Sequence, residues 1–303
     1  MMKRIYSLMT KPITALIDMD IIVYRAGFAS QKRRYVATCP GKEDMWFDVG
    51  QTLADIRRAS DYEAQGWTLG YTEEPEEVGR ACHSAKRMVQ SILEATKASK
   101  HYGLLTSNDK TNYRFDVAKT QVYKGNRVVP KPIHYDAIRE YLINYWDARV
   151  VSGMEADDKM GIMQTKALAK GVRTIICTID KDMDMIPGAH YNFVTGRKYH
   201  CTKFGHLTLD KSDKKPKLSG GGLMWFYAQT LLGDSADNIP GIKGTGSVTV
   251  YNLLKDCKTE DEMVEKVEKC YQKYYTKDYK DILHEVSTLL WIQQDQRREY
   301  WRR

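Results

Sequence analysis

The sequence predicts an α/β fold in which a central, mostly parallel sheet is flanked by helices. Short apolar runs rich in β-branched residues alternate with longer segments of helical pattern along the 303 residues. Carboxylate side chains stand at the ends of at least four of these runs. Because crossover connections bring the carboxyl ends of parallel strands to one edge of the sheet, we expect these carboxylates to converge there.

The first two predicted strands cover residues 13–17 and 102–106. Asp18 directly follows the first strand, and Asp109 follows the second after a short polar turn. A helix N-cap is the structural alternative to a functional role for Asp18.

A long insertion precedes the second strand. Residues 28–80 are polar and aromatic, and they indicate weak helices or a hairpin around residues 40–41. The pattern of residues 78–100 predicts a helix with one apolar face.

Cations alternate with aromatic rings after the second strand, in segments 112–115 and 123–127. Lysine and arginine suit phosphates and aromatic rings stack on bases, so this pattern is typical of a nucleic-acid-binding segment. A solvated loop is the alternative explanation. Residues 133–146 then predict a helix with Ile138 and Leu142 on its apolar face.

Glu155, Asp157 and Asp158 are crowded into four residues, between a short strand at 148–151 and a helix that ends near Gly171. Like charges at this spacing repel and raise one another's pKa, and a bound divalent cation relieves that repulsion. The alternative is an acidic first turn, whose charge suits the helix dipole. The recurrence of acidic clusters after other apolar runs favours the metal site.

The clearest strand covers residues 172–179 and ends at Asp180. Asp182 and Asp184 follow at alternate positions. A plain turn does not need three aspartates in this arrangement, whereas a metal site uses them as ligands.

Two predicted helices, residues 223–232 and 247–254, are joined by a segment that contains Asp234 and Asp237. The segment continues into a glycine-rich turn at residues 241–246, whose backbone N–H groups can hold a phosphate at the start of the second helix. Many tight turns share such a pattern, so it is weak evidence when taken alone.

The remaining segments carry less information. Residues 191–195 predict one more strand, and residues 211–217 predict a surface loop or linker. Residues 260–303 are charge-rich and helical in pattern, and they end in Arg302 and Arg303.

The composition suits a polyanionic partner. The net charge is +8 and the pI is about 9.0, which together with acidic clusters indicates a nucleic acid and a cation site, although a solubilising surface explains charge alone equally well. The six cysteines are scattered and none has zinc-knuckle spacing, so we expect reduced thiols. No run is long enough to span a bilayer, and we expect a soluble, cytoplasmic protein with no membrane partner.

An all-carboxylate pocket selects hard cations, so Mg²⁺, with Mn²⁺ as a substitute, is expected rather than zinc. Two such ions can activate a water and stabilise the leaving oxygen of a phosphodiester. The candidate metal ligands are Asp18, Asp109, Glu155, Asp157, Asp158, Asp180, Asp182, Asp234 and Asp237.

These motifs, in this order, resemble the 5′→3′ exonuclease and flap-endonuclease family, which includes the 5′ nuclease domain of bacterial DNA polymerase I and free-standing phage enzymes. The resemblance spans about residues 13–254. Its motifs are Asp18 after a strand, Asp109 followed by NYR at 112–114, YKGNR at 123–127, EADD at 155–158, TIDKD at 178–182 and GDSADNIPG at 233–241. Each motif alone is unspecific, and the set is specific.

The resemblance implies a 5′ nuclease or PIN-like α/β core, a helical arch after the second strand and a helix-turn-helix-like element that grips duplex DNA. By motif, Asp18, Asp109, Glu155, Asp157 and Asp158 correspond to first-metal ligands, and Asp180, Asp182, Asp234 and Asp237 to second-metal ligands. Lys124 and Arg127 correspond to arch cations that act on the scissile phosphate. The residues implied to contact DNA are Arg114, Tyr123, Lys124, Arg127, Gly241, Lys243, Gly244 and Gly246, and the turn also corresponds to a K⁺ site.

The predicted organisation is a nuclease core at residues 1–218, with the insertion at 28–80 and an arch at about 110–146, followed by a helical DNA-binding region at 219–303. We expect a monomer that cleaves DNA at 5′ ends and flaps, with RNA–DNA hybrids and replication proteins as further partners. The chain length without a polymerase domain is more similar to phage members, for which the location is the host cytoplasm. The insertion and the tail after about residue 260 match nothing in the family.

Two other functions remain as alternatives. A haloacid-dehalogenase-type phosphatase shares a strand that ends in Asp18-Met19-Asp20, where the first aspartate is a nucleophile, but it leaves the 155–158 cluster unexplained. A structure-specific DNA-binding protein without catalysis would have no reason to keep crowded carboxylates beside phosphates.

Overall fold

The computed structural model describes residues 12–295 of the chain, which divide into two compact units. The first contains residues 12–20, 91–129 and 147–295, and the second contains residues 21–90 and 130–146. This division differs from the predicted boundary at residue 218, because residues 219–295 pack in the same unit as the main sheet.

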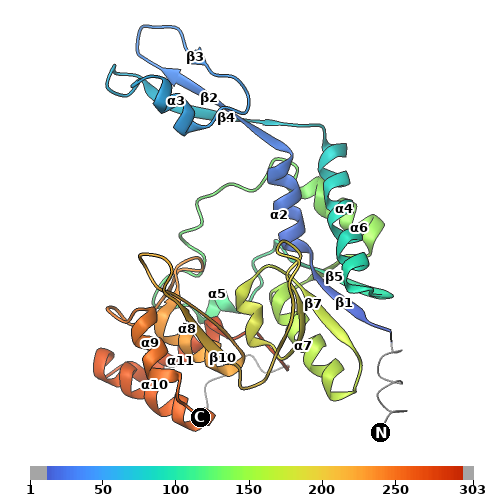
Figure 1. The fold of residues 1–303 in the computed structure, drawn as a ribbon, viewed down its shortest axis with the longest axis vertical. Coiled ribbons are helices and arrows are strands. Elements are labelled where there is room, and N and C mark those ends of the chain that lie inside the picture. Colours follow the sequence, from blue (N-terminus) through green and yellow to red (C-terminus); the bar gives the residue numbers. More distant parts are fainter. Residues whose placement is uncertain (1–11, 296–303) are drawn as a thin grey trace. The chain divides into compact units, whose positions relative to one another are not determined.

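The first unit is built on a six-stranded sheet in the order β6-β5-β1-β7-β8-β9, which Figure 1 shows with α7 (Ala156–Ala169) beside it. All neighbours are parallel except β8 and β9. The strands are β1 (Thr14–Asp18), β5 (Lys100–Thr106), β6 (Arg149–Val151), β7 (Thr174–Cys177), β8 (Gly188–Tyr191) and β9 (Lys198–Cys201). The prediction of a mostly parallel central sheet flanked by helices is therefore confirmed.

Strand β1 lies in the middle of this sheet and pairs with β5 on one side and β7 on the other. Ala15, Leu16 and Ile17 are fully buried, as expected for a parallel strand covered on both faces. The carboxyl ends of β1, β5, β6 and β7 point the same way, so the residues that follow them gather at one edge.

The helices of the first unit largely follow the predicted pattern. Helix α8 (Gly222–Leu232) is buried through Leu231, which explains its nearly uninterrupted apolar sequence. It packs against α9 (Ser247–Leu254), α10 (Glu260–Tyr275) and α11 (Tyr279–Leu290). The final residues Arg302 and Arg303 lie outside the described part of the chain.

One strand prediction was wrong, and one strand pair was not predicted. The strand expected at 191–195 ends at Tyr191, because the chain turns back there into β9. The loop expected at 211–217 is confirmed for residues 211–216, and it joins two strands that the sequence did not predict, β10 (His206–Asp210) and β11 (Lys217–Gly221), which form an antiparallel hairpin. Both hairpin strands alternate exposed and half-buried residues, so they lack the continuous apolar run that marks the central strands.

The predicted helical arch at 110–146 is not a continuous helix. Only α5 (Arg114–Val117) and α6 (Tyr135–Trp146) are helical, and residues 118–134 between them are irregular. Gly125, Pro130 and Pro132 explain this result, because glycine and proline both disfavour a helix interior. The predicted helix at 133–146 is confirmed by α6.

The second unit contains the insertion. Its three-stranded antiparallel sheet has the order β3-β2-β4, formed by β2 (Gln31–Thr38), β3 (Met45–Trp46) and β4 (Thr68–Pro75). The β2–β3 hairpin around residues 40–41 and the short helix α3 (Leu53–Ala59) confirm both alternatives raised from the sequence. Helices α2 (Met19–Ala29) and α4 (Val78–Thr96) contribute residues to both units.

Within residues 12–295, no helix combines the length and the apolar character needed to cross a bilayer.

Candidate metal centre

Four carboxylates gather at the carboxyl edge of the main sheet. Asp18 ends β1, Glu155 and Asp157 begin α7 beyond β6, and Asp180 follows β7. Burial raises the pKa of Asp157 well above its usual value, and the charges of Asp18, Asp180 and Glu155 raise it further. Asp157 therefore lies within electrostatic range of the other three carboxylates.

A second group of carboxylates adjoins the first through Asp180. Burial raises the pKa of Asp182 to about 8, with further contributions from Asp180 and Asp234. Burial also raises the pKa of Asp180, and the charges of Asp237 and Asp234 add to this effect. Asp180 is thus coupled to both groups, and the two groups form one continuous cluster.

Neutral side chains hold several of these carboxylates in place. The Thr178 hydroxyl donates to Asp18 Oδ2 at 2.7 Å, and the Gln229 amide donates to Asp182 Oδ1 at 2.6 Å. Backbone N–H groups contribute as well, since that of Asp182 donates to Asp180 Oδ1 at 2.8 Å. These donors carry no positive charge, so they orient the carboxylates without removing their mutual repulsion.

The donor set fits a hard divalent cation. It consists of carboxylate oxygens only, which Mg²⁺ and Mn²⁺ prefer to softer ligands. The Asp157 carboxylate makes no hydrogen bond or ion pair with the described residues; three like charges raise its pKa, and the charge of Lys124 partly offsets them. A cation between these groups would replace the repulsion by attraction.

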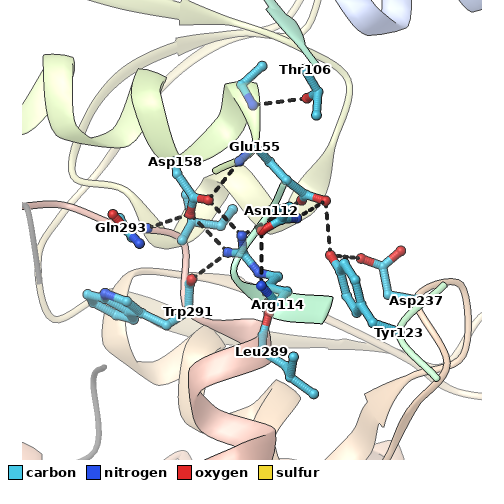
Figure 2. A network of polar contacts seen from close by, with 12 residues as sticks. Thr106, Asn112, Arg114, Tyr123, Glu155, Asp158, Asp237, Leu289, Trp291 and Gln293 are labelled. Atoms are coloured by element: carbon cyan, nitrogen blue, oxygen red, sulfur yellow. Dashed lines mark hydrogen bonds and ion pairs between the residues drawn. The ribbon is translucent and has the colours of Figure 1, made fainter. Parts of the chain in front are cut away.

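Glu155 has a different environment from Asp157. Burial alone would raise its pKa, but the charges of Lys124 and Arg114 outweigh that effect and lower it to about 2. Lys124 Nζ forms an ion pair with Glu155 Oε1, which also accepts a hydrogen bond from Asn112 Nδ2 at 3.0 Å. Figure 2 shows Glu155 beside Asn112 and Tyr123.

A polar loop closes one side of the cluster. The Tyr123 hydroxyl lies 3.2 Å from Glu155 Oε1 and 2.9 Å from Asp237 Oδ2, so it bridges the two carboxylate groups (Figure 2). The Lys124 backbone N–H donates to the Asp237 carbonyl at 2.9 Å, and Arg127 Nη2 contacts Asp237 Oδ1 at 2.5 Å. Both predicted phosphate-binding cations are therefore paired with carboxylates in this structure.

Arg114 and Asp158 form a buried ion pair, which corrects two predictions. Arg114 Nη1 and Nη2 contact the two oxygens of Asp158 at 2.6 and 2.9 Å, and the side chains are 3% and 0% exposed (Figure 2). Arg114 is too deeply buried to contact DNA. Asp158 already uses both oxygens on a guanidinium, so the structure argues against its role as a metal ligand.

The same pair connects the sheet edge to the last described segment of the chain. Arg114 also donates to the carbonyls of Leu289 and Trp291 at 2.8 and 2.7 Å. The Gln293 backbone N–H donates to Asp158 Oδ1 at 3.0 Å (Figure 2). This network fixes the start of α7, where Asp157 lies, against α5 and the end of α11.

Two further predicted residues differ from expectation. Asp109 is exposed, and its two oxygens accept hydrogen bonds from the hydroxyls of Thr111 and Ser152 at 2.7 and 2.9 Å. Hydrogen bonding from Thr111 is also the main cause that lowers its pKa. Tyr123 is only 3% exposed and packs edge-on against Phe115, so in this structure it has no free face on which a base could stack.

The glycine-rich turn at 241–246 connects α8 and α9, as predicted. Gly244 has φ of 82°, a conformation that favours glycine, and Gly246 forms the N-cap of α9. Lys243 is exposed in this turn. A cavity of about 270 Å³ lies nearby and is lined by residues that include Lys181, Lys217, Asp234 and Ser247.

The sequence analysis missed the residues that support the ligands. Asn112 and Thr178 stand inside motifs that were noted, so their short polar side chains next to an acidic group were a usable signal. Gln229 is separated from Asp182 by 47 residues and lies in an apolar helix, so no local pattern marks it.

Comparison with known proteins gives consistent results, although no protein-family model matches the chain. The chain is 28% identical over 196 residues to a 5′-3′ exonuclease of Buchnera aphidicola, which covers 62% of this chain and 64% of that protein. It is 27% identical over 188 residues to a thermostable DNA polymerase I of Thermus thermophilus, which covers 59% of this chain but only 21% of the polymerase. The chain thus spans less than two thirds of either relative.

Among solved structures, the bacteriophage T5 D15 protein co-crystallised with metal ions is similar in fold. The TM-score is 0.52 at 14% identity, and the alignment covers 91% of this chain and 89% of that one. The motifs, the cluster at the sheet edge and these similarities agree: the chain is a homologue of proteins named 5′-3′ exonuclease and of part of DNA polymerase I, and it has the fold of the T5 D15 protein.

Proposed function

We propose that this protein is a metal-dependent nuclease that hydrolyses DNA phosphodiesters at or near 5′ ends, as a 5′→3′ exonuclease, a 5′ flap endonuclease or both. The observation that carries this proposal is the continuous carboxylate cluster at the sheet edge, in which Asp157 and Asp182 have raised pKa values and no cationic hydrogen-bond partner. The names of the relatives and the net charge of +8 support the same class of substrate.

The residues suggest two adjacent cation sites. Asp18, Glu155, Asp157 and Asp180 would hold the first ion, and Asp180, Asp182, Asp234 and Asp237 the second. When bound, Mg²⁺ or Mn²⁺ would lower the pKa of an attacking water and stabilise the charge that develops on the phosphate oxygens. Thr178 and Gln229 keep the carboxylates oriented, and the Arg114–Asp158 pair fixes the start of α7.

Lys124 and Arg127 act on the substrate in this proposal. In this structure they form ion pairs with Glu155 and Asp237. A bound metal ion would neutralise these two carboxylates in their place. Released from these carboxylates, the two side chains can contact the scissile phosphate and offset its developing charge. The exposed Lys243 and the backbone of the 241–246 turn would bind the duplex phosphates, with K⁺ as a candidate ion there.

We propose that the protein acts as a cytoplasmic monomer during DNA replication or host DNA degradation, and that RNA–DNA hybrids are a second substrate. The phosphate backbone contacts proposed above do not require a deoxyribose, so removal of an RNA primer uses the same residues.

Product analysis tests the central proposal. A 5′-labelled flap duplex and a matching blunt duplex would be incubated with the protein in Mg²⁺ and in EDTA. We expect short 5′ products that require Mg²⁺, and the ratio between the two substrates separates endonuclease from exonuclease action. Asp157→Asn should lose cleavage, whereas Asp281→Asn, which changes an exposed aspartate of α11 outside the cluster, should retain it.

Two outcomes would overturn the proposal. Turnover of p-nitrophenyl phosphate without DNA cleavage would indicate a phosphatase. Tight DNA binding with no hydrolysis of either substrate in Mg²⁺ or Mn²⁺ would indicate a binding protein.

A further inference from the structure

A second group of metal-ligating side chains lies beside the carboxylate cluster. Asp184 from the short 3₁₀ helix η1 (Lys181–Met185), His190 from β8 and Cys201 from β9 place one potential ligand atom each within 4.8 Å of one another. His190 and Cys201 are 1% and 5% exposed, and Asp184 is partly buried. Their donors are nitrogen, sulfur and oxygen, which distinguishes this group from the all-oxygen cluster.

His190 presents an unsatisfied nitrogen in this group. Its Nε2 lies 2.8 Å from the Ile186 carbonyl oxygen, and because a carbonyl only accepts, Nε2 carries the proton. Burial lowers the pKa of His190 to about 4, so the ring is neutral and Nδ1 has a lone pair. This buried Nδ1 has no hydrogen-bond partner. A buried acceptor without a partner is costly, and a metal ion would satisfy it.

The surrounding residues orient the other two ligands. The Tyr199 hydroxyl donates to Asp184 Oδ1 at 2.6 Å, and its ring stacks on His190 with centroids 5.4 Å apart. Such contacts to the ligands are typical of built metal sites. Gly221 lies against the group, since a Cβ there would be 3.5 Å from Cys201 Sγ. The absence of a side chain at this position leaves room for an ion.

We propose that Asp184, His190 and Cys201 bind one zinc-class divalent cation, with a water as the fourth ligand. Thiolate, imidazole and carboxylate together select Zn²⁺ or Co²⁺ over Mg²⁺. Tetrahedral zinc brings its ligand atoms to roughly 3.3–3.8 Å from one another. Side-chain rotations would achieve this, and the thiol proton would leave to solvent when the ion binds.

The site has a positioning role. It joins η1 to the β8–β9 hairpin through one ion, and η1 begins directly after Asp180 and contains Asp182. A bound ion would hold this segment, and therefore both aspartates, at a fixed place beside the sheet edge. The proposal concerns binding and stability, and it does not depend on the nuclease activity proposed above.

Metal retention by the full chain tests the proposal. The protein would be given one equivalent of Zn²⁺, dialysed against excess Mg²⁺ and assayed for zinc, and Co²⁺ loading would be followed by absorption. We expect about one zinc per chain and a thiolate-to-cobalt charge-transfer band. Cys201→Ser and His190→Gln should retain less than a tenth of the zinc, whereas Cys257→Ser, a matched change of another buried cysteine, should retain it.

The Co²⁺ band decides the outcome even if a variant fails to fold, because it is measured on the wild-type protein and requires a cysteine ligand. Absence of the band overturns the proposal, and so does zinc retention in a folded Cys201→Ser variant. Asp157→Asn should retain the zinc, so failure of the nuclease assay and failure of this site are distinguishable.

Discussion

Asp157 and Asp158 are neighbours in the first turn of α7, yet their surroundings are opposite. Asp158 is fully buried and receives two hydrogen bonds from Arg114 and two from backbone N–H groups. Asp157 has no such partner and lies among the charges of Asp18, Asp180 and Glu155. The difference teaches that the folded chain neutralises one of two adjacent acidic groups and leaves the other among like charges, where the proposed cation would bind.

Two adjacent aspartates of the 155–158 motif thus differ in role: Asp158 stabilises the fold, and Asp157 is a candidate metal ligand. A carboxylate that the protein neutralises contributes to the folded state, and its removal leaves an unpaired buried charge. A carboxylate left among like charges destabilises the folded state, and the proposed binding of a metal gives a reason for its presence. Substitutions at the two positions should therefore have opposite effects on stability.

The largest expected effect is that of Asp158→Asn. The change removes the carboxylate that holds the buried Arg114 guanidinium through two hydrogen bonds and leaves it the more distant Glu155, 4.0 Å away, which costs about 3–5 kcal/mol of unfolding free energy. Chemical denaturation with and without Mg²⁺ measures this loss. Asp281→Asn is the surface control, and a loss below about 1 kcal/mol for Asp158→Asn would show that the pair contributes little.

Asp157→Asn should produce the reverse pattern. Cleavage should fall by about 10²-fold or more, because the proposed first ion would lose a charged ligand. In metal-free buffer the same variant should be at least as stable as the wild type, because one of the repelling charges is gone. Single-turnover cleavage measures the loss of rate, and thermal unfolding in EDTA measures the stability. A destabilised Asp157→Asn variant would show that Asp157, like Asp158, stabilises the folded state.

The pH dependence of stability tests a second carboxylate that lies among like charges, Asp182. The pKa of Asp182 is about 8 in the folded protein and 3.8 ordinarily, so the folded state keeps a proton that the unfolded state releases. In EDTA, the unfolding free energy should therefore fall as the pH rises from about 4 to about 8, by on the order of 1 kcal/mol or more.

Two controls accompany this measurement. Mg²⁺ should remove much of the fall, because the ion takes the place of the proton on the cluster. Asp182→Asn should flatten the profile in EDTA, and an unchanged profile in that variant would assign the effect to another group.

The smallest effects are expected at the cations. Lys124→Ala should slow single-turnover cleavage with a modest loss of DNA binding, because the proposed function places Lys124 on the scissile phosphate. Lys243→Ala should weaken DNA binding several-fold and lower the slope of log affinity against log salt concentration by about one, which corresponds to one lost phosphate contact. The cleavage rate at saturating DNA should not change. These roles would be contradicted if Lys124→Ala weakened DNA binding without slowing cleavage, or if Lys243→Ala slowed cleavage at saturating DNA.

Much of the fold could be predicted because buried parallel strands leave a strong local signal. The run before Asp18 is apolar throughout, and β1 is indeed central and fully covered. The β10–β11 hairpin was missed because half-exposed strands lack such a run. The segment 118–134 was predicted by analogy as an arch, although its glycine and prolines disfavour a helix.

The sequence could predict which residue types form the candidate site, but not which side chains pair with its carboxylates. The sequence places Asp157 and Asp158 side by side without stating which way each points. Only the folded chain brings Arg114 to Asp158 and Gln229 to Asp182, across 44 and 47 residues. Long-range pairing of this kind decides which acidic group is neutralised, and no local pattern contains it.

The hydrogen bonds from Arg114 to the carbonyls of Leu289 and Trp291 have a practical consequence for truncation. A shortened enzyme that ends before α11 would lose two acceptors of a buried guanidinium, and with Gln293 a donor to Asp158. We expect such a fragment to be less stable even though it keeps every candidate metal ligand. The buried Arg114 therefore sets a lower limit on the length of a stable fragment, which we expect to extend through Gln293.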